Sequence, residues 1–171
     1  KGFSVIATAN TRDKGVNEMS AALKRRFNIV VLPTPASLET EIDIVKTRVE
    51  QLSGGMELNA SLPESDVVEK VCTIFRELRN GETCDKSQKL KTTTGVLSTA
   101  EAISLLCGSM ALAGSFGNGK VSDEDLAAGL AGAVIKEEDK DVTVWKEYLE
   151  NVMKKRGSKW SGLYNACREL L

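Results

Sequence analysis

Two different hydrophobic patterns divide the chain. In the first, apolar residues run almost continuously through 3–9 and 28–32, which is typical of strands covered on both faces. Between them, residues 18–26 predict a short helix with a basic end, which complements the helix dipole. In the second, apolar residues recur at spacings of three and four, which predicts helices. The pattern therefore predicts a strand-helix-strand part over residues 1–35 and an all-helical part over residues 36–171.

Recognisable residues bound the helices predicted in the second part. Pro63 and Gly81 stand at the start and end of the second of these helices, and Gly157 separates the last two. Ser98 and Ser122 are each followed three residues later by an acidic residue, which is typical of a helix start. The clearest apolar stripe belongs to the first helix and consists of Leu38, Ile42, Val45, Val49 and Leu52.

Two connecting segments need an interpretation of their own. Residues 82–94 are polar and predict a mobile loop. Residues 114–120 match the G-x-x-x-x-G-K pattern of a phosphate-binding loop, but Val121 stands where a hydroxyl is needed to bind Mg²⁺. The preceding segment also has a helical pattern, whereas a phosphate loop follows a strand. We interpret residues 114–120 as a loop between two helices.

The amino-acid composition limits which partners, catalytic groups and metal sites the chain can be expected to have. The chain has 171 residues, a net charge of -1 and no histidine. The charge gives no electrostatic reason to expect a nucleic acid or a membrane as partner, and the absence of histidine excludes imidazole-based catalysis and imidazole metal sites. No apolar run approaches the roughly 20 residues that span a bilayer. Cys72, Cys107 and Cys167 fall on apolar helix faces, so we expect core thiols in a reducing cytoplasm and no metal site.

Several features of residues 1–35, taken together, are more specific than any one of them alone. The strand ends in A-T-A-N at Asn10, and the following helix ends in Arg25-Arg26-Phe27 directly before the second strand. This order, followed by an all-helical region, resembles the C-terminal part of an AAA+ ATPase, especially of the MoxR-like and dynein-related branch. The resemblance implies that residues 1–35 are the end of an α/β P-loop AAA+ core and that residues 36–171 are a helical lid domain.

The resemblance also implies roles for individual residues. Asn10 matches sensor 1, which helps to hold the water that attacks the γ-phosphate; the alternative is an asparagine that only closes the strand. Arg26, or the adjacent Arg25, matches the arginine finger that reaches a neighbouring subunit's nucleotide; the alternative is a basic helix end. Thr99 stands where the family often has the sensor 2 arginine of the lid, which is a departure from the pattern.

The resemblance implies partners as well. We expect the parent protein to hydrolyse ATP with Mg²⁺ in a homo-oligomeric ring, such as a hexamer, and to remodel a protein client in a chaperone-like way, with a von Willebrand A-type protein as one candidate. The chain starts at Lys1 without a methionine and lacks the Walker elements, so we expect an N-terminal portion to be missing and this chain alone to bind no nucleotide. The alternative function is a non-enzymatic helical module that docks a partner.

Overall fold

The computed structural model of the chain describes residues 2–8, 20–56 and 59–171. Its internal contacts divide it into two units, Lys1–Thr34 and Pro35–Leu171. We call the first the N-terminal unit and the second the helical unit, and we describe each by itself.

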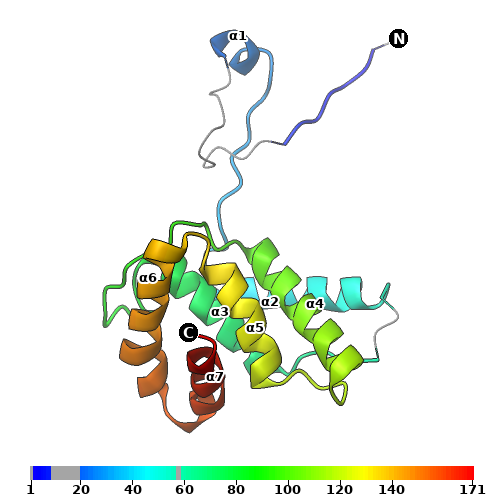
Figure 1. Cartoon of the computed structure of the whole chain (residues 1–171). Coiled ribbons are helices and arrows are strands. Elements are labelled where there is room, and N and C mark those ends of the chain that lie inside the picture. The colour runs from blue at the N-terminus through cyan, green and yellow to red at the C-terminus, as the bar shows by residue number, and fades with distance from the viewer. Residues whose placement is uncertain (1, 9–19, 57–58) are drawn as a thin grey trace. The chain divides into compact units, whose positions relative to one another are not determined.

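The described part of the N-terminal unit contains one regular element, the short helix α1 (Ala21–Lys24), shown in Figure 1. The Ser20 side chain caps it by accepting a hydrogen bond from the Leu23 backbone N–H at 3.3 Å. The strands predicted over 3–9 and 28–32 do not form among the described residues, which are extended there without a partner. The reason is physical: the backbone N–H and C=O groups of a strand need a neighbouring strand, and these two segments do not pair with each other.

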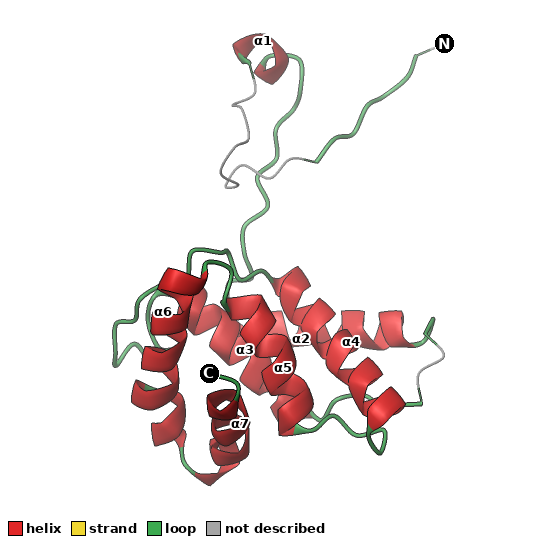
Figure 2. Cartoon of the chain, viewed as in Figure 1, coloured by secondary structure: helices red, strands yellow, loops and turns green. Residues whose placement is uncertain are grey.

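The described residues of the helical unit form helices joined by loops, with no strand, as Figure 2 shows. This confirms the prediction of an all-helical second part. Only an isolated antiparallel bridge between Glu82 and Lys89 interrupts the helical pattern. The helices are α2 (Leu38–Ser53), α3 (Ser65–Asn80), α4 (Thr99–Phe116), α5 (Asp123–Val134), α6 (Glu138–Asn151), the 3-10 helix η1 (Met153–Arg156) and α7 (Ser158–Glu169).

Local sequence signals explain where these helices begin and end. Ser98 and Ser122 each close a complete capping box with the acidic residue three positions later. Gly81 ends α3 in the left-handed conformation, with φ at 69°, which residues with a Cβ rarely adopt. These starts and stops are where the sequence places them.

The core of the helical unit forms around α4. This helix packs against α2, α3 and α5, and α7 covers the other side of α5; Figure 1 shows α4 and α5 side by side. By length and composition α4 could also cross a membrane, but a core helix passes the same test, and Leu106, Met110 and Ala113 of α4 are buried in this unit. The largest fully buried side chains are Trp145, Tyr148, Phe75, Ile74, Leu78, Leu97, Leu106, Met110, Leu126, Leu130, Leu149 and Met153.

Three of the four cysteines lie in this core, as predicted. Cys72, Cys107 and Cys167 are buried free thiols, whereas Cys84 is an exposed free thiol. Burial raises the pKa of Cys72 and of Cys167 to about 12, so neither forms a thiolate at neutral pH. These cysteines act as small apolar residues.

The loop over residues 82–94 differs from its prediction. It is polar, yet its two ends are held by buried carboxylates rather than left in solvent. Near its start, Glu77 Oε1 accepts the Cys84 backbone N–H at 2.8 Å. At its end, Asp141 accepts the backbone N–H of Thr94 at 2.8 Å and the Thr94 hydroxyl at 2.7 Å. Composition alone predicted a mobile loop, because both partners lie on other elements.

Candidate functional site

The two candidate finger residues lie at the basic end of α1. The Arg25 N–H donates to the Ala21 carbonyl at 3.2 Å, and the Arg26 N–H donates to the Leu23 carbonyl at 2.9 Å. Both side chains are exposed, and neither forms an ion pair with any other residue that the structure describes. Their backbones are therefore fixed by a helix turn while their guanidinium groups remain available to an anion. Phe27, the next residue, is 37% exposed.

Asn10, the predicted sensor 1 residue, lies within residues 9–19, outside the described part of the chain. Its role and its distance from Arg26 stay predictions. Of the three predicted site residues, the structure therefore describes Arg25 and Arg26, which are adjacent in sequence and both exposed.

A second group of polar residues surrounds a fully buried carboxylate on α2. Glu41 is 0% exposed, yet its two oxygens accept four hydrogen bonds. Arg79 of α3 donates to both oxygens, at 2.9 and 2.7 Å, in the two-pronged geometry that suits a guanidinium. Arg76 donates to Oε2 at 3.3 Å, and the Thr99 hydroxyl donates to Oε1 at 3.0 Å. We call Glu41, Arg76, Arg79 and Thr99 the Glu41 cluster.

The Glu41 cluster keeps its carboxylate charged inside the protein. Burial alone would raise the pKa of Glu41, but the hydrogen bond and positive charge of Arg79, with the bonds from Thr99 and Arg76, lower it below its ordinary value. Removing one partner of such a buried pair leaves an uncompensated charge, which is strongly destabilising. The cluster is therefore a rigid point that joins α2, α3 and the start of α4.

The Glu41 cluster also explains the departure at Thr99. This threonine, which stands where the family resemblance led us to expect an arginine, is the first residue of α4 and a partner of Glu41. Two arginines of α3 lie against the same carboxylate. Sequence reasoning missed the cluster; the available signal was an acidic residue directly beside Leu38 and Ile42 on the apolar stripe of α2.

A further buried carboxylate, Glu77, ties α3 to the C-terminal helices. It accepts a hydrogen bond from the Tyr148 hydroxyl at 2.7 Å and pairs with Arg156. Burial and the charge of Glu77 raise the pKa of Tyr148 well above its ordinary value. Arg156 lies over the Trp160 ring at 4.6 Å, so this cation belongs to the packing of the bundle.

The phosphate-loop match over residues 114–120 has a structural explanation. It ends α4 and packs against the chain near Asn59, where the Ser61 N–H donates to the Gly119 carbonyl at 2.8 Å. Gly119 has φ at 83°, and a Cβ there would lie 2.8 Å from the Asn59 carbonyl oxygen. The glycines thus allow two loops to approach closely. The preceding element is a helix, as predicted, but residues 114–116 belong to α4 itself, so the loop between the two helices begins at Gly117.

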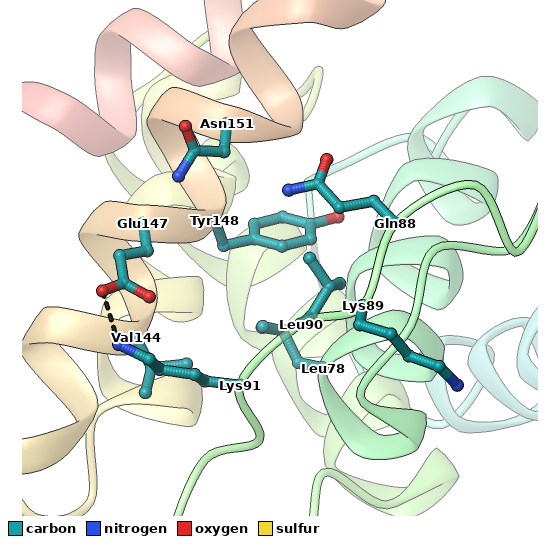
Figure 3. A pocket seen from close by; sticks show the side chains of 9 residues that line it. All are labelled: Leu78, Gln88, Lys89, Leu90, Lys91, Val144, Glu147, Tyr148 and Asn151. Atoms are coloured by element: carbon teal, nitrogen blue, oxygen red, sulfur yellow. Dashed lines mark hydrogen bonds and ion pairs between the residues drawn. The ribbon is translucent and has the colours of Figure 1, made fainter.

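A shallow pocket of about 420 Å³ lies between residues 88–91 and helix α6. Figure 3 shows that apolar Leu78, Leu90 and Val144 line it together with the Tyr148 ring, while Lys91 and Glu147 form an ion pair of 2.7 Å at its edge. The pocket includes no predicted site residue. Among the described residues, no group of three His, Cys, Asp or Glu side chains could hold a metal ion.

Comparison with known proteins identifies a matching family. Residues 39–170 match the family model of the YehL-like AAA+ ATPase C-terminal domain. Over 172 aligned residues the chain is 34% identical to the uncharacterized protein YehL of Escherichia coli strain K12. The alignment covers 99% of this chain and 46% of that relative, so the chain spans about half the length of the relative it matches. No solved structure matches the chain.

The matched range coincides with the all-helical unit, whose helices, buried carboxylates and core have been described above. The helical unit, with α4 at its centre, is therefore the part of the chain that matches the family model. This chain belongs to the family of YehL-like AAA+ ATPase C-terminal domains.

Proposed function

We propose that this chain is the C-terminal part of a MoxR-type AAA+ ATPase that hydrolyses ATP in a homo-oligomeric ring. The observation that carries the proposal is the exposed Arg25-Arg26 pair at the end of α1, in a chain that belongs to an AAA+ family. In this proposal residues 1–35 complete an α/β core, in which 3–9 and 28–32 are strands paired with other strands. Residues 36–171 form its lid.

Arg26 is the residue that we propose as the arginine finger, with Arg25 as the alternative. A guanidinium suits this role because it is always charged and its planar fork matches phosphate oxygens. An arginine finger that stabilises the transition state of phosphoryl transfer is worth about 10³ to 10⁵ in rate. The helix turn that ends α1 fixes the Arg26 backbone, and its exposed side chain supports a role outside its own unit.

Asn10 is the residue that we propose as sensor 1. A carboxamide both donates and accepts hydrogen bonds and carries no charge that pH could change, which suits the positioning of an attacking water. In the parent protein, Mg²⁺ would supply positive charge opposite the nucleotide phosphates; no group of described residues in this chain could hold it. Within this chain, Asn10 orients the water and Arg26 stabilises the transferred phosphoryl group of a neighbouring subunit.

The biological setting is part of the same proposal. The energy of ATP hydrolysis remodels a protein client in a chaperone-like way, and a von Willebrand A-type protein is the partner that the MoxR resemblance suggests. We place the protein in the cytoplasm, which agrees with its free thiols. Its net charge of -1 favours protein over nucleic acid as client.

The test is steady-state ATP turnover by the full-length protein that contains this chain. Arg26→Ala should lower turnover by about 10³-fold while ATP binding, measured by titration of a fluorescent analogue, stays nearly unchanged. Lys24→Ala is the matched control, because it removes a cation from the same helix end and should change turnover little.

The comparison with Arg25→Ala decides between the two adjacent arginines. If only Arg25→Ala abolishes turnover, the finger is Arg25. Unchanged turnover in both variants would refute the finger. A full-length protein that binds no ATP would favour the non-enzymatic helical module.

A further inference from the structure

We infer that Arg76 is a positioning residue that fixes the point where the chain enters the helical unit, so that the joint between the two units lies before Pro35. This inference rests on the proposed function only in its consequence for turnover. The local part of it concerns three residues of the helical unit, Pro35, Ala36 and Arg76, and can be tested on this chain without nucleotide.

The contacts of Arg76 carry the inference. Its NH1 group donates to the Pro35 carbonyl at 3.1 Å, and its NH2 group donates to the Ala36 carbonyl at 2.7 Å. These are the two residues directly before Ser37, the N-cap of α2. A single guanidinium on α3 thus holds two successive carbonyls more than 35 residues away in sequence, before the first helix of the unit begins.

The guanidinium of Arg76 is itself held in place. It donates to Glu41 Oε2 at 3.3 Å, and Glu41 is fully buried. Glu41 is fixed in turn by Arg79, which also donates to the Leu97 carbonyl at 2.9 Å. The Arg76 side chain is 18% exposed, so solvent competes little for its hydrogen bonds. Pro35 and Ala36 are therefore attached to the rigid Glu41 cluster and not only to their own chain neighbours.

The segment before Pro35 is held differently. Residues 28–34 are exposed, have no regular secondary structure, and make no hydrogen bond with another described residue. The contacts change abruptly at Pro35: residues 28–34 make no hydrogen bond with another described residue, whereas the Pro35 and Ala36 carbonyls accept charge-assisted hydrogen bonds from Arg76. Pro35 and Ala36 therefore move with the helical unit, which puts the joint before Pro35.

This location of the joint matters for the candidate finger. Arg25 and Arg26 lie close to the joint along the chain, so the joint's position affects how the helical unit can move relative to them. A displacement of about 1 Å in a contributing group can lower a rate by about 10²-fold. Loss of the Arg76 contacts would add Pro35 and Ala36 to the joint. The helical unit would then be held less firmly relative to Arg25 and Arg26.

The first experiment uses backbone ¹⁵N relaxation of this chain. In the wild type, the amides of Ala36 and Ser37 should relax like those of α2, and those of residues 29–32 should show faster internal motion. Arg76→Gln should make Ala36 relax like residues 29–32. Arg76→Lys keeps a cation beside Glu41, so it should fold, but an ammonium cannot reproduce the fork and should loosen Ala36 as well.

The matched control is Arg48→Gln. Arg48 is exposed on α2, where it donates to Gln51 at 2.7 Å, and its loss should leave Ala36 unchanged. Thermal unfolding of each variant shows whether the bundle is intact. Ordered relaxation of Ala36 in folded Arg76→Gln and Arg76→Lys would overturn the inference, as would fast motion of Ala36 in the wild type.

The second experiment measures turnover in the full-length protein. Arg76→Lys should lower kcat by about 10-fold to 100-fold and leave the KM for ATP nearly unchanged, because it misplaces the helical unit without touching nucleotide. An unchanged kcat despite a loosened Ala36 would overturn the positioning role. A wild-type protein without turnover would refute the proposed function and leave the relaxation result valid, so the two failures are distinguishable.

Discussion

The two units of this chain differ in where their apolar side chains lie. In the helical unit, Phe75 and Trp145 are fully buried among the helices that the same unit supplies. In the N-terminal unit, Phe3, Ile6 and Leu32 are 90%, 94% and 86% exposed. Both sets have the pattern of a protein core, but among the described residues only those of the helical unit bury their apolar side chains through contacts within their own unit. The comparison shows that an apolar pattern predicts that side chains become buried, but not which residues they pack against.

The polar groups show the same difference. The helical unit buries Glu41, Glu77 and Asp141, each with several hydrogen-bond partners from other elements. The described part of the N-terminal unit contains no buried residue, and its Ser20 cap is an exposed hydrogen bond. We therefore expect substitutions of buried residues in the helical unit to act mainly on stability, and substitutions in the N-terminal unit to act on activity.

The largest expected effect on stability comes from the centre of the helical unit. Phe75→Ala should lower the free energy of unfolding of this chain by about 3–5 kcal/mol, because it leaves a cavity in a closed core. Val31→Ala, at a side chain that is 82% exposed, should change it by less than about 0.5 kcal/mol. Urea titration followed by circular dichroism measures both; equal losses would remove the contrast between the units.

A smaller effect is expected at Asp141, where one oxygen accepts the Thr94 hydroxyl and the N–H groups of Lys136 and Glu137 at 2.7–2.9 Å. Asp141→Asn places an amide donor or a neutral oxygen there and should cost about 1–3 kcal/mol. Asp139→Asn, at an exposed position on the same helix, is the matched control. The measurement is again the free energy of unfolding in urea.

The Asp141 effect should also depend on pH. Burial alone would raise its pKa, but hydrogen bonds from Glu137, Thr94 and Lys136 lower the pKa to about 2, below its value of 3.8 in an unfolded chain. The charged carboxylate therefore stabilises the fold fully above pH 4, and this contribution is lost as pH falls through 2. The difference in stability between wild type and Asp141→Asn should shrink over that window; a constant difference would contradict this electrostatic explanation.

The smallest expected effect compares two caps of the same chemistry. Ser98→Ala should destabilise the helical unit by about 1 kcal/mol, because it breaks the capping box with Glu101. Ser20→Ala removes the cap of α1 and should leave the unfolding midpoint of this chain unchanged, since α1 buries no residue. Equal shifts in the thermal midpoint would show that α1 is part of the cooperative unit.

The helices of the helical unit could be predicted because their signals are local. The stripe from Leu38 to Leu52 and the serine-acid pairs at Ser98 and Ser122 each lie within one helix. The family resemblance came mainly from a short stretch too, residues 3–35, and the family relationship found by comparison agrees with it at the level of AAA+ proteins. The MoxR branch and the roles of Asn10 and Arg26 remain proposals.

The contacts that position the helices could not be predicted, because their partners are distant in sequence. Arg76 meets Glu41 from 35 residues away, and Thr94 meets Asp141 from 47 residues away, with no motif at either end. The same limit explains why the loop over residues 82–94 was predicted to be mobile: its composition does not reveal the distant residues that hold it. It also explains the strand prediction, since pairing depends on residues outside the segment that carries the pattern.

The most direct test of the central claim mixes two inactive variants of the full-length protein. If Arg26 acts on a neighbouring subunit and Asn10 on its own, a ring of Asn10→Ala and Arg26→Ala subunits contains some complete sites. Co-expression with two different tags, followed by sequential purification, isolates mixed rings. Equal mixtures should recover roughly a quarter of wild-type ATP turnover, because each site needs one subunit of each kind in the correct order around the ring. Turnover no higher than that of either variant alone would contradict the account.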